Sequence, residues 1–287
     1  MSIRLIYCMC MAALPVLAGS CIFDDISECP ASQYVVQLSI KDINYENVAH
    51  FPQLKANDEH SSFHHSVGTI YYILSDMVTG KRIKESTLMA VNGEERTYPL
   101  TFTDIAEGEY VLTVWGNITQ THPTGVLHPD NKEYTDVYMA SRTFRFDNSY
   151  RTTELPLERT KGLLLLFCYN FPANVTSIKQ NITSLHKEVN EGFHYSGSNN
   201  VEKQMPFRPL TTTFLAPSSN KVSHLKLGFY TGNAETEKLF LELPDMQLTV
   251  RRNEISSIAI DYNETENVYE IWTFIYKQWT MIHRLSL

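Results

Sequence analysis

Hydrophobic and polar residues alternate with a period of two along most of the chain, and the helical period of 3.6 is nearly absent. Near the beginning, Tyr34, Val36 and Leu38 fall on one side of a predicted strand, while Gln37 and Ser39 fall on the other. Short segments of this kind recur at fairly regular spacing, with Gly, Asn and Pro between them. The pattern predicts an all-β fold made of β-sandwiches.

The predicted strands fall into two sets, separated by a charged stretch at 157–162. The first set covers 34–40, 69–74, 98–102, 110–115, 142–146 and 152–157, and the second covers 163–169, 175–185, 225–229, 239–243, 247–250 and 255–260. Without its first 20 residues the chain of 287 keeps 267, which suits two domains better than one. We therefore predict an N-terminal β-sandwich over 34–158 and a C-terminal one over 159–287.

The alternation continues to the last residue and predicts one more strand there. One side carries Trp279, Met281, His283, Leu285 and Leu287; the other carries Thr280, Ile282, Arg284 and Ser286. Chain ends tend to fray unless something holds them, so a strand in this place calls for a partner. It is either the final edge strand of the second sandwich or a strand that is given to another protein.

The first 20 residues have the order of a secretory signal peptide: one basic residue, Arg4, an apolar run over 5–17, and small residues before Cys21. This apolar run is too short to span a bilayer of about 30 Å. Leu17-Ala18-Gly19-Ser20-Cys21 resembles the lipobox of bacterial lipoproteins, although Ala18 stands where Leu is usual. We expect Cys21 to be acylated and to hold the protein on the outer membrane; the alternative is an ordinary cleaved signal.

Acidic residues follow Cys21 closely. Asp24, Asp25 and Glu28 lie in the predicted tether over 21–33. Their position resembles the export signal that brings lipoproteins of the Bacteroidales type to the cell surface. The resemblance implies surface exposure, and the alternative is a solvated tether with no further role.

The overall charge argues against one class of partner. Removal of Arg4 with the signal leaves 23 basic residues against 32 acidic ones. A protein that binds nucleic acid needs basic surface to neutralise phosphates. We therefore expect no nucleic-acid partner.

Two of the five cysteines remain unassigned once the N-terminus is accounted for. Cys8 and Cys10 leave with the signal, and Cys21 carries lipid. A disulfide between Cys29 and Cys168 is one outcome in an oxidising compartment. A buried Cys168 thiol within an apolar strand is the other.

Catalytic and metal-binding patterns are missing. His60, His64 and His65 have the spacing of metal ligands but fall in or beside a polar loop, where a rigid site is not expected. Ser196 lacks the Gly-x-Ser-x-Gly surroundings of a nucleophile elbow. We expect no enzyme activity, no metal site and no cofactor.

The aromatic content leaves a sugar-binding alternative open. The chain has 16 Tyr and three Trp, and stacking platforms for glycans use such residues. Three long polar segments, 44–66, 117–136 and 186–209, contain seven aromatics: Tyr45, Phe51, Phe63, Tyr134, Phe193, Tyr195 and Phe207. They are scattered over the three segments, whereas other aromatics alternate along strands as core residues do.

Four features together resemble the anchor lipoproteins of type V fimbriae, a family related to the fimbrillins. They are the lipobox with its acidic stretch and Cys29-Pro30; the strand at 67–76 leading to Gly80; the stretch Gly108-Glu109-Tyr110-Val111-Leu112-Thr113-Val114-Trp115-Gly116-Asn117; and Leu155-Pro156-Leu157-Glu158-Arg159. All four lie in the signal and the N-terminal half, and the rest of the chain is assigned from its length and strand pattern alone.

The resemblance implies two tandem transthyretin-like, Greek-key β-sandwich domains after a lipoprotein signal peptide. It further implies a non-enzymatic protein that binds a fimbrillin subunit, anchors the fimbria and terminates its assembly. On this hypothesis the last strand is donated to the fimbrillin, and Trp279, Met281, Leu285 and Leu287 are the inserted side chains. The alternatives are a surface glycan-binding lipoprotein and a fimbrial tip or adhesin subunit.

Overall fold

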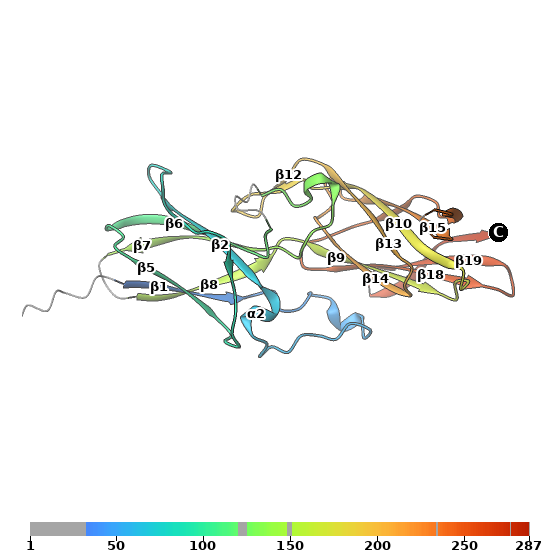
Figure 1. The fold of residues 1–287 in the computed structure, drawn as a ribbon, viewed down its shortest axis with the longest axis horizontal. Helices are drawn as coiled ribbons and strands as arrows, with labels where there is room; N and C mark the ends of the chain where they lie inside the picture. The colour runs from blue at the N-terminus through green and yellow to red at the C-terminus, as the bar shows by residue number, and fades with distance from the viewer. Residues whose placement is uncertain (1–32, 120–124, 148–150, 234, 276, 287) are drawn as a thin grey trace, which may run out of the picture.

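The computed structural model describes residues 33–119, 125–147, 151–233, 235–275 and 277–286. Nearly all regular structure in them is β-strand, which confirms the predicted all-β fold. Figure 1 shows two lobes arranged end to end along the long axis of the molecule. We call residues 33–159 the first lobe and residues 162–286 the second lobe.

The first lobe contains eight strands in one bent sheet with the order β3-β2-β6-β7-β8-β1-β5, and β4 pairs with β2. Their bounds are β1 Gln33–Ile40, β2 Thr69–Asp76, β3 Arg82–Glu85, β4 Met89–Ala90, β5 Tyr98–Thr103, β6 Gly108–Gly116, β7 Tyr138–Phe146 and β8 Arg151–Arg159. β7 meets β8 at only two residue pairs, so the sheet bends there. The hydrophobic core lies between the two halves, and it includes the alternating Tyr34, Val36 and Leu38.

The second lobe has two main sheets, with the orders β13-β10-β15-β16 and β14-β9-β18-β19-β20. Its strands are β9 Gly162–Tyr169, β10 Val175–Leu185, β11 Glu188–Val189, β12 Tyr195–Ser196, β13 Asn199–Pro206, β14 Leu210–Leu215, β15 Ser223–Thr231, β16 Lys238–Glu242, β17 Met246–Leu248, β18 Ile255–Asn263, β19 Val268–Ile275 and β20 Gln278–Ser286. β17 pairs with β15, and β11 pairs with β12 in a small separate sheet.

The two lobes repeat one pairing arrangement. In the first, β1 lies between antiparallel β5 and parallel β8; in the second, β9 lies between antiparallel β14 and parallel β18. The second lobe then adds β19 and β20 beyond β18. β20 is therefore an addition at the outer edge of the last sheet.

Several strands were not predicted from the sequence. β3, β4, β14 and β19 are absent from the predicted sets, and β13 occupies part of the segment predicted as a long loop. In β13 only Val201 is buried, so the strand carries almost no hydrophobic signal.

A segment of the first lobe covers the outer face of β9. Residues 42–54, here called the covering segment, connect β1 to the rest of the lobe and contain a short helix, η1 Val48–His50. Phe51 of this segment packs with Leu163, Leu165 and Phe167 of β9. The alternate residues of β9 face the core between the sheets. Burial on both faces explains why β9 is a continuous apolar run.

A buried arginine links the two lobes. Arg159, only 4% exposed, donates from Nε to Asp136 Oδ2 at 2.6 Å and from Nη1 to Asn253 Oδ1 at 2.8 Å. Its guanidinium carbon lies 4.1 Å from the ring centre of Tyr45 in the covering segment. One side chain thus contacts the first lobe, the second lobe and the covering segment.

The remaining helical segments are short: α2 Phe63–Ser66 and η2 Pro129–Asn131. Among the described residues, no helix has the length and apolar character needed to cross a membrane.

Candidate functional site: the last strand and the far end of the second lobe

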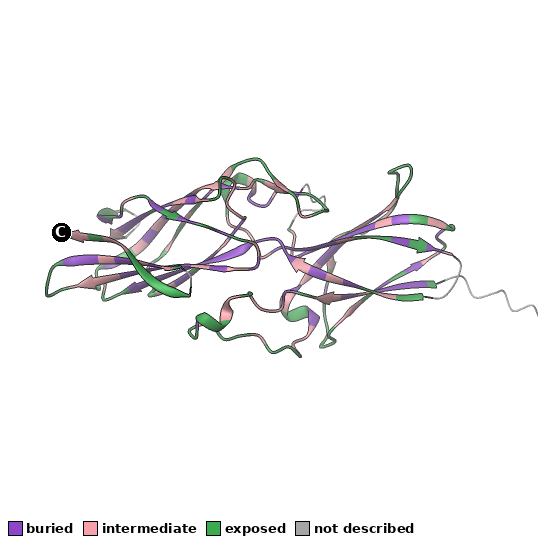
Figure 2. Ribbon diagram, turned by 180° about the vertical axis from the view of Figure 1, so that it is seen from behind, coloured by how far each residue is buried: buried purple, intermediate pink, exposed green. Residues whose placement is uncertain are grey.

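β20 is an edge strand with one neighbour. It pairs antiparallel with β19, from Gln278 opposite Ile275 to Ser286 opposite Val268. None of its described residues is buried, and Figure 2 shows this strand, which runs to the C mark, largely in the colours of exposed and intermediate residues. No strand of the described part of the chain borders its outer edge.

A β-bulge divides the predicted apolar face of β20. The register shifts so that His283 lies opposite Ile271 but Met281 opposite Trp272, which leaves Ile282 as the extra residue. Ile282 and Leu285 pack against the core between the sheets. The prediction that one continuous face carries Trp279, Met281 and Leu285 is therefore wrong for this paired state, because the bulge reverses the alternation at Ile282.

Trp279 and Met281 lie on the other face, with aromatic neighbours. The Trp279 ring centre is 5.6 Å from that of Phe274 and 6.0 Å from that of Phe167, in edge-to-face geometry. Trp279 and Met281 each keep 39% of their surface exposed, and Tyr169 keeps 42%.

Other sheet edges carry groups that block strand addition. In β8, the Leu157 carbonyl accepts a hydrogen bond from the Lys41 N–H, so the backbone groups of Leu157 face β1. Successive residues of a strand direct their backbone groups to opposite edges, so those of Pro156 face the open edge of β8. Pro156 offers no N–H there, and Arg142 Nη1 already donates to the Glu154 carbonyl at 2.9 Å. β20 contains neither Pro nor Lys, the residues that most often protect an edge.

A side chain of the first lobe blocks the edge of β14. Glu133 Oε1 accepts the Phe214 N–H at 2.7 Å, and its other oxygen, Oε2, lies 2.6 Å from Lys203 Nζ. A side chain therefore occupies the position that an added strand would use. β5, which among the described strands pairs with β1 alone, contains Pro99.

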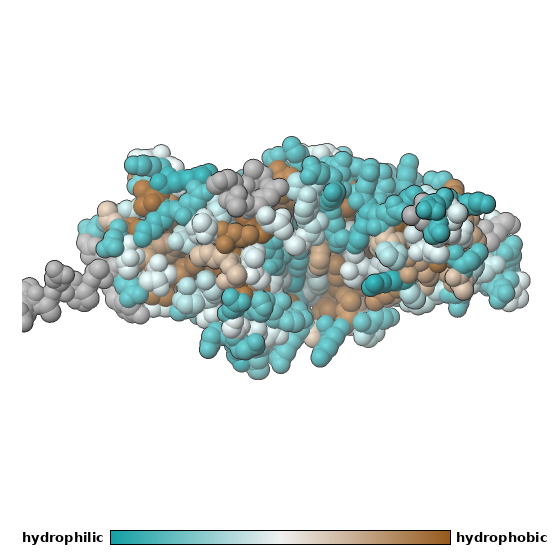
Figure 3. Space-filling view, viewed as in Figure 1, coloured by the Kyte–Doolittle hydropathy of each residue, from teal (hydrophilic) through white to brown (hydrophobic). Residues whose placement is uncertain are grey.

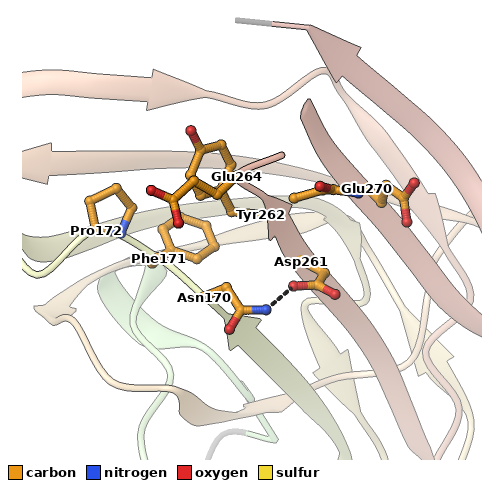
Figure 4. A pocket seen from close by; sticks show the side chains of 8 residues that line it. Asn170, Phe171, Pro172, Asp261, Tyr262, Glu264 and Glu270 are labelled. Carbon is orange, nitrogen blue, oxygen red and sulfur yellow. Dashed lines mark hydrogen bonds between the residues drawn. The ribbon is translucent and has the colours of Figure 1, made fainter. Parts of the chain in front are cut away.

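An open hollow of about 600 Å³ lies near the end of β20, where β9 and β18 end. Figure 4 shows Asn170 donating to Asp261, with Phe171, Pro172, Tyr262 and Glu264 gathered on one side and Glu270 on the other. The Asn170–Asp261 bond measures 2.8 Å. Arg284 of β20 lies 3.5 Å from Glu270 and forms a second ion pair with Glu266, so β20 partly neutralises this acidic end.

The chemistry available in this hollow is limited. Tyr262 stacks on the buried Tyr269 at 4.7 Å, and burial, with the charge of Tyr262 as a smaller cause, raises the pKa of Tyr269 to about 12. That hydroxyl stays neutral at physiological pH, so it is not a general base. Among the described residues, no group of three His, Cys, Asp or Glu side chains is placed to hold a metal ion.

Several residues singled out in the sequence lie outside the described part of the chain: Cys21, Asp24, Asp25, Glu28, Cys29 and Leu287. Cys168 is described, and it is a free, buried thiol in β9. Burial raises its pKa to about 12. Its side chain faces the core between the sheets of the second lobe.

The loop aromatics form no stacking platform in the described structure. Phe51 and Phe63 are each 1% exposed, and the Tyr195 hydroxyl donates to the Thr160 carbonyl at 2.8 Å. Each of the three long polar segments makes a contact at or across the boundary between the lobes, through Phe51, His128 and Tyr195. His64 and His65 lie in the short helix α2, beside this polar loop, and His65 Nε2 lies 3.3 Å from Asn57 Oδ1.

Sequence reasoning did not identify the residues that block the other edges. Pro156 did carry a signal, because a proline within a strand indicates an edge. Arg142 carried none, since its bond to the Glu154 carbonyl depends on how the sheet bends.

Comparison with known proteins shows the fold alone. No protein-family profile and no curated protein sequence matches the chain. Among solved structures, the fimbrial anchor protein Mfa2 from Porphyromonas gingivalis superposes with a TM-score of 0.50 at 11% identity, over 88% of this chain and 100% of that one.

Two other solved structures share the fold to a similar degree. A protein assigned as an adhesin from Bacteroides ovatus gives a TM-score of 0.51 at 13% identity, over 88% of this chain and 96% of that one. A protein assigned as polysaccharide-binding from Bacteroides thetaiotaomicron gives 0.52 at 11%, over 88% and 98%.

Proposed function

We propose that this chain is a non-enzymatic, lipid-anchored protein of the outer membrane that holds a fimbria at the cell surface and ends its assembly. The fold shared with a fimbrial anchor protein supports this proposal, together with the lipobox at Cys21 and the acidic residues behind it. The observation that carries it is β20, a strand at one end of the molecule whose edge is unprotected.

The layout of the molecule suits a connector. β1 begins at one end of the long axis, and β20 runs to the other end (Figure 1). Acyl chains on Cys21 would hold the first end at the membrane. Buried methylene groups supply about 0.8 kcal/mol each, so two or more chains hold firmly. The second lobe then carries β20 away from the membrane, toward a fimbrillin subunit.

β20 is suited to donation because it is poorly buried in its own sheet and pairs with β19 through a bulge. No described residue of β20 is fully buried, and only Ile282 and Leu285 of this strand pack against the core between the sheets. The bulge at Ile282 exists only in the pairing with β19. A regular strand has period two, so without the bulge Trp279, Met281, Leu285 and Leu287 would share one face and fill alternate pockets of a partner.

The first lobe is not suited to accept a strand from another subunit. β1 is an interior strand of its sheet, between β8 and β5, and both Val36 and Leu38 are fully buried. Pro156 and Arg142 obstruct the edge of β8, as described above. A subunit that donates a strand and accepts none stops a chain of donations at its own position.

Substitutions in β20 test this function. We expect Trp279→Asp with Met281→Asp to leave a folded, acylated protein, because both side chains are already 39% exposed. Cells with this variant should release fimbriae into the medium, since an inserted strand cannot bury two charges. Thr280→Asp is the matched control, because alternation directs residue 280 away from the partner's groove.

The measurement is the ratio of fimbrillin in the medium to fimbrillin on cells. Membrane fractionation and thermal unfolding of the same variants confirm anchoring and folding. Retention of fimbriae by the folded double variant would overturn strand donation. Loss of the protein from membranes after Cys21→Ala would support the anchor separately.

A further inference from the structure

The turn between β2 and β3 exposes large apolar side chains. Val78 is 88% exposed, Met77 51% and Ile83 40%. These are three of the eight large hydrophobic side chains that are exposed in the described residues, and all three belong to one short hairpin. Brown atoms in Figure 3 appear at the upper left of the first lobe, where Figure 1 draws this hairpin.

The turn is held rigidly in this exposed form. Asp76 Oδ1 accepts the Val78 N–H at 3.1 Å, the Thr79 N–H at 2.7 Å and the Thr79 hydroxyl at 2.7 Å. The chain reverses at Gly80, whose φ of +67° suits glycine. Met77 is tied back by its N–H to the Glu109 carbonyl at 2.9 Å. The hydrogen bonds of the turn thus hold Val78 in its exposed position.

The hairpin lies at the end of the first lobe where β1 begins. Gln33 pairs with Thr103 and Tyr34 with Arg151, while Asp76 pairs with Tyr110 and Gly108 with Phe146. Each of these pairs is the last one between its two strands, and all four lie at the same end of the lobe. Cys21 precedes Gln33 by twelve positions, and twelve residues span at most about 40 Å. An acyl anchor on Cys21 therefore keeps this end of the molecule near the bilayer.

We propose that the β2–β3 hairpin contacts the lipid surface, with Val78 and Met77 inserted among the headgroups. This inference rests on the proposed acyl anchor. Charge does not carry it, because Lys81, Arg82 and Lys84 are offset by nearby acidic residues such as Asp76 and Glu85. The contact is apolar, so it needs no anionic lipid. With two points of attachment, the long axis of the protein would stand away from the membrane and present β20 outward.

Thiol accessibility tests the contact. The full-length acylated protein with Cys29→Ser and Val78→Cys is inserted into the outer leaflet of preformed phosphatidylcholine vesicles, and a water-soluble maleimide is added. Leu239→Cys is the matched control, since Leu239 is 54% exposed but lies in the second lobe. The unlipidated Cys21→Ser form of each variant in buffer provides the reference rate. Cys168 is buried and does not interfere.

We expect insertion to slow modification of residue 78 by about tenfold and to change that of residue 239 by less than about twofold. Equal rates at residue 78 with and without vesicles would overturn the lipid contact while the anchor stands, and would favour a protein partner for the hairpin. Co-flotation of the protein with the vesicles is measured in the same samples. Failure to float would overturn the acyl anchor, and this inference with it.

Discussion

The Nε2 atom of His128 accepts the Ala216 N–H at 2.8 Å, across the boundary between the two lobes. Its Nδ1 lies 2.9 Å from the Lys132 carbonyl, so that nitrogen carries the proton and the ring is neutral. The His128 carbonyl also accepts from Asn199 at 2.8 Å. A fully buried residue from a loop of the first lobe thereby joins two segments of the second, one through its side chain and one through its backbone carbonyl.

Protonation of His128 should weaken the fold. Burial, with the nearby Lys161 as a smaller cause, lowers the pKa of His128 from 6.5 to about 3. Between these values the unfolded chain binds a proton that the folded protein does not, so stability falls as pH falls. We expect a loss of about 1 kcal/mol between pH 6.5 and 5.5 from this group.

Urea unfolding at a series of pH values measures this loss. The variant His128→Asn should be less stable at pH 7 but should lose less stability on acidification. His64→Asn is the control, because His64 is exposed. An unchanged pH slope in His128→Asn would show that other groups cause the acid sensitivity.

Replacement of Arg159 should be strongly destabilising. Arg159 Nε donates to Asp136 Oδ2 at 2.6 Å, and the other carboxylate oxygen, Oδ1, has no hydrogen-bond partner among the described residues. Arg159→Met leaves this buried carboxylate unpaired, which costs about 3–5 kcal/mol. Denaturant unfolding measures the cost. Arg251→Met serves as control, because the Arg251–Glu254 pair is exposed and should contribute less than about 1 kcal/mol. The double variant with Asp136→Asn should recover part of the loss.

Truncation of Phe51 should loosen the second lobe although Phe51 belongs to the first. Its ring is 1% exposed and packs on β9 and on Phe274, 5.1 Å away. Phe51→Ala should cost about 3–5 kcal/mol. Hydrogen exchange should then rise in β9 and β18 more than in β1. The exposed neighbour Gln53→Ala should leave exchange unchanged. Faster exchange confined to the first lobe would contradict this role of the covering segment.

Cys168 should be inert in the folded protein. Burial raises its pKa to about 12, which alone reduces the thiolate fraction about a thousandfold. In the Cys29→Ser variant, a maleimide should label Cys168 only after unfolding, as followed by mass spectrometry. The same experiment on the wild-type chain distinguishes the two outcomes left open by the sequence, a Cys29–Cys168 disulfide and a buried free thiol. If Cys29 and Cys168 are joined, unfolding without reductant exposes neither thiol.

Local alternation predicted much of the fold correctly. Tyr34, Val36 and Leu38 do face one core, and Val175–Leu185 is a strand with the predicted bounds. Such strands can be predicted from the sequence because one face is buried and the other is exposed to solvent. The alternation of apolar and polar residues therefore follows the two faces directly. β13 and β14 were missed because their polar side chains are paired with neighbours that the sequence does not reveal: the Thr213 hydroxyl donates to Gln180 Oε1 at 3.0 Å, and Lys203 Nζ lies 2.6 Å from Glu133 Oε2.

The sequence by itself determined the all-β character, the N-terminal lipoprotein signal as a prediction, and the alternating pattern of the last strand. These depend on neighbouring residues or on local periodicity. Tertiary structure alone decided that a bulge at Ile282 divides that strand, that Pro156 and Arg142 obstruct another edge, and that the covering segment buries the outer face of β9. Each of these depends on which strands become neighbours, because edge exposure, register and burial are properties of pairs of segments and not of one.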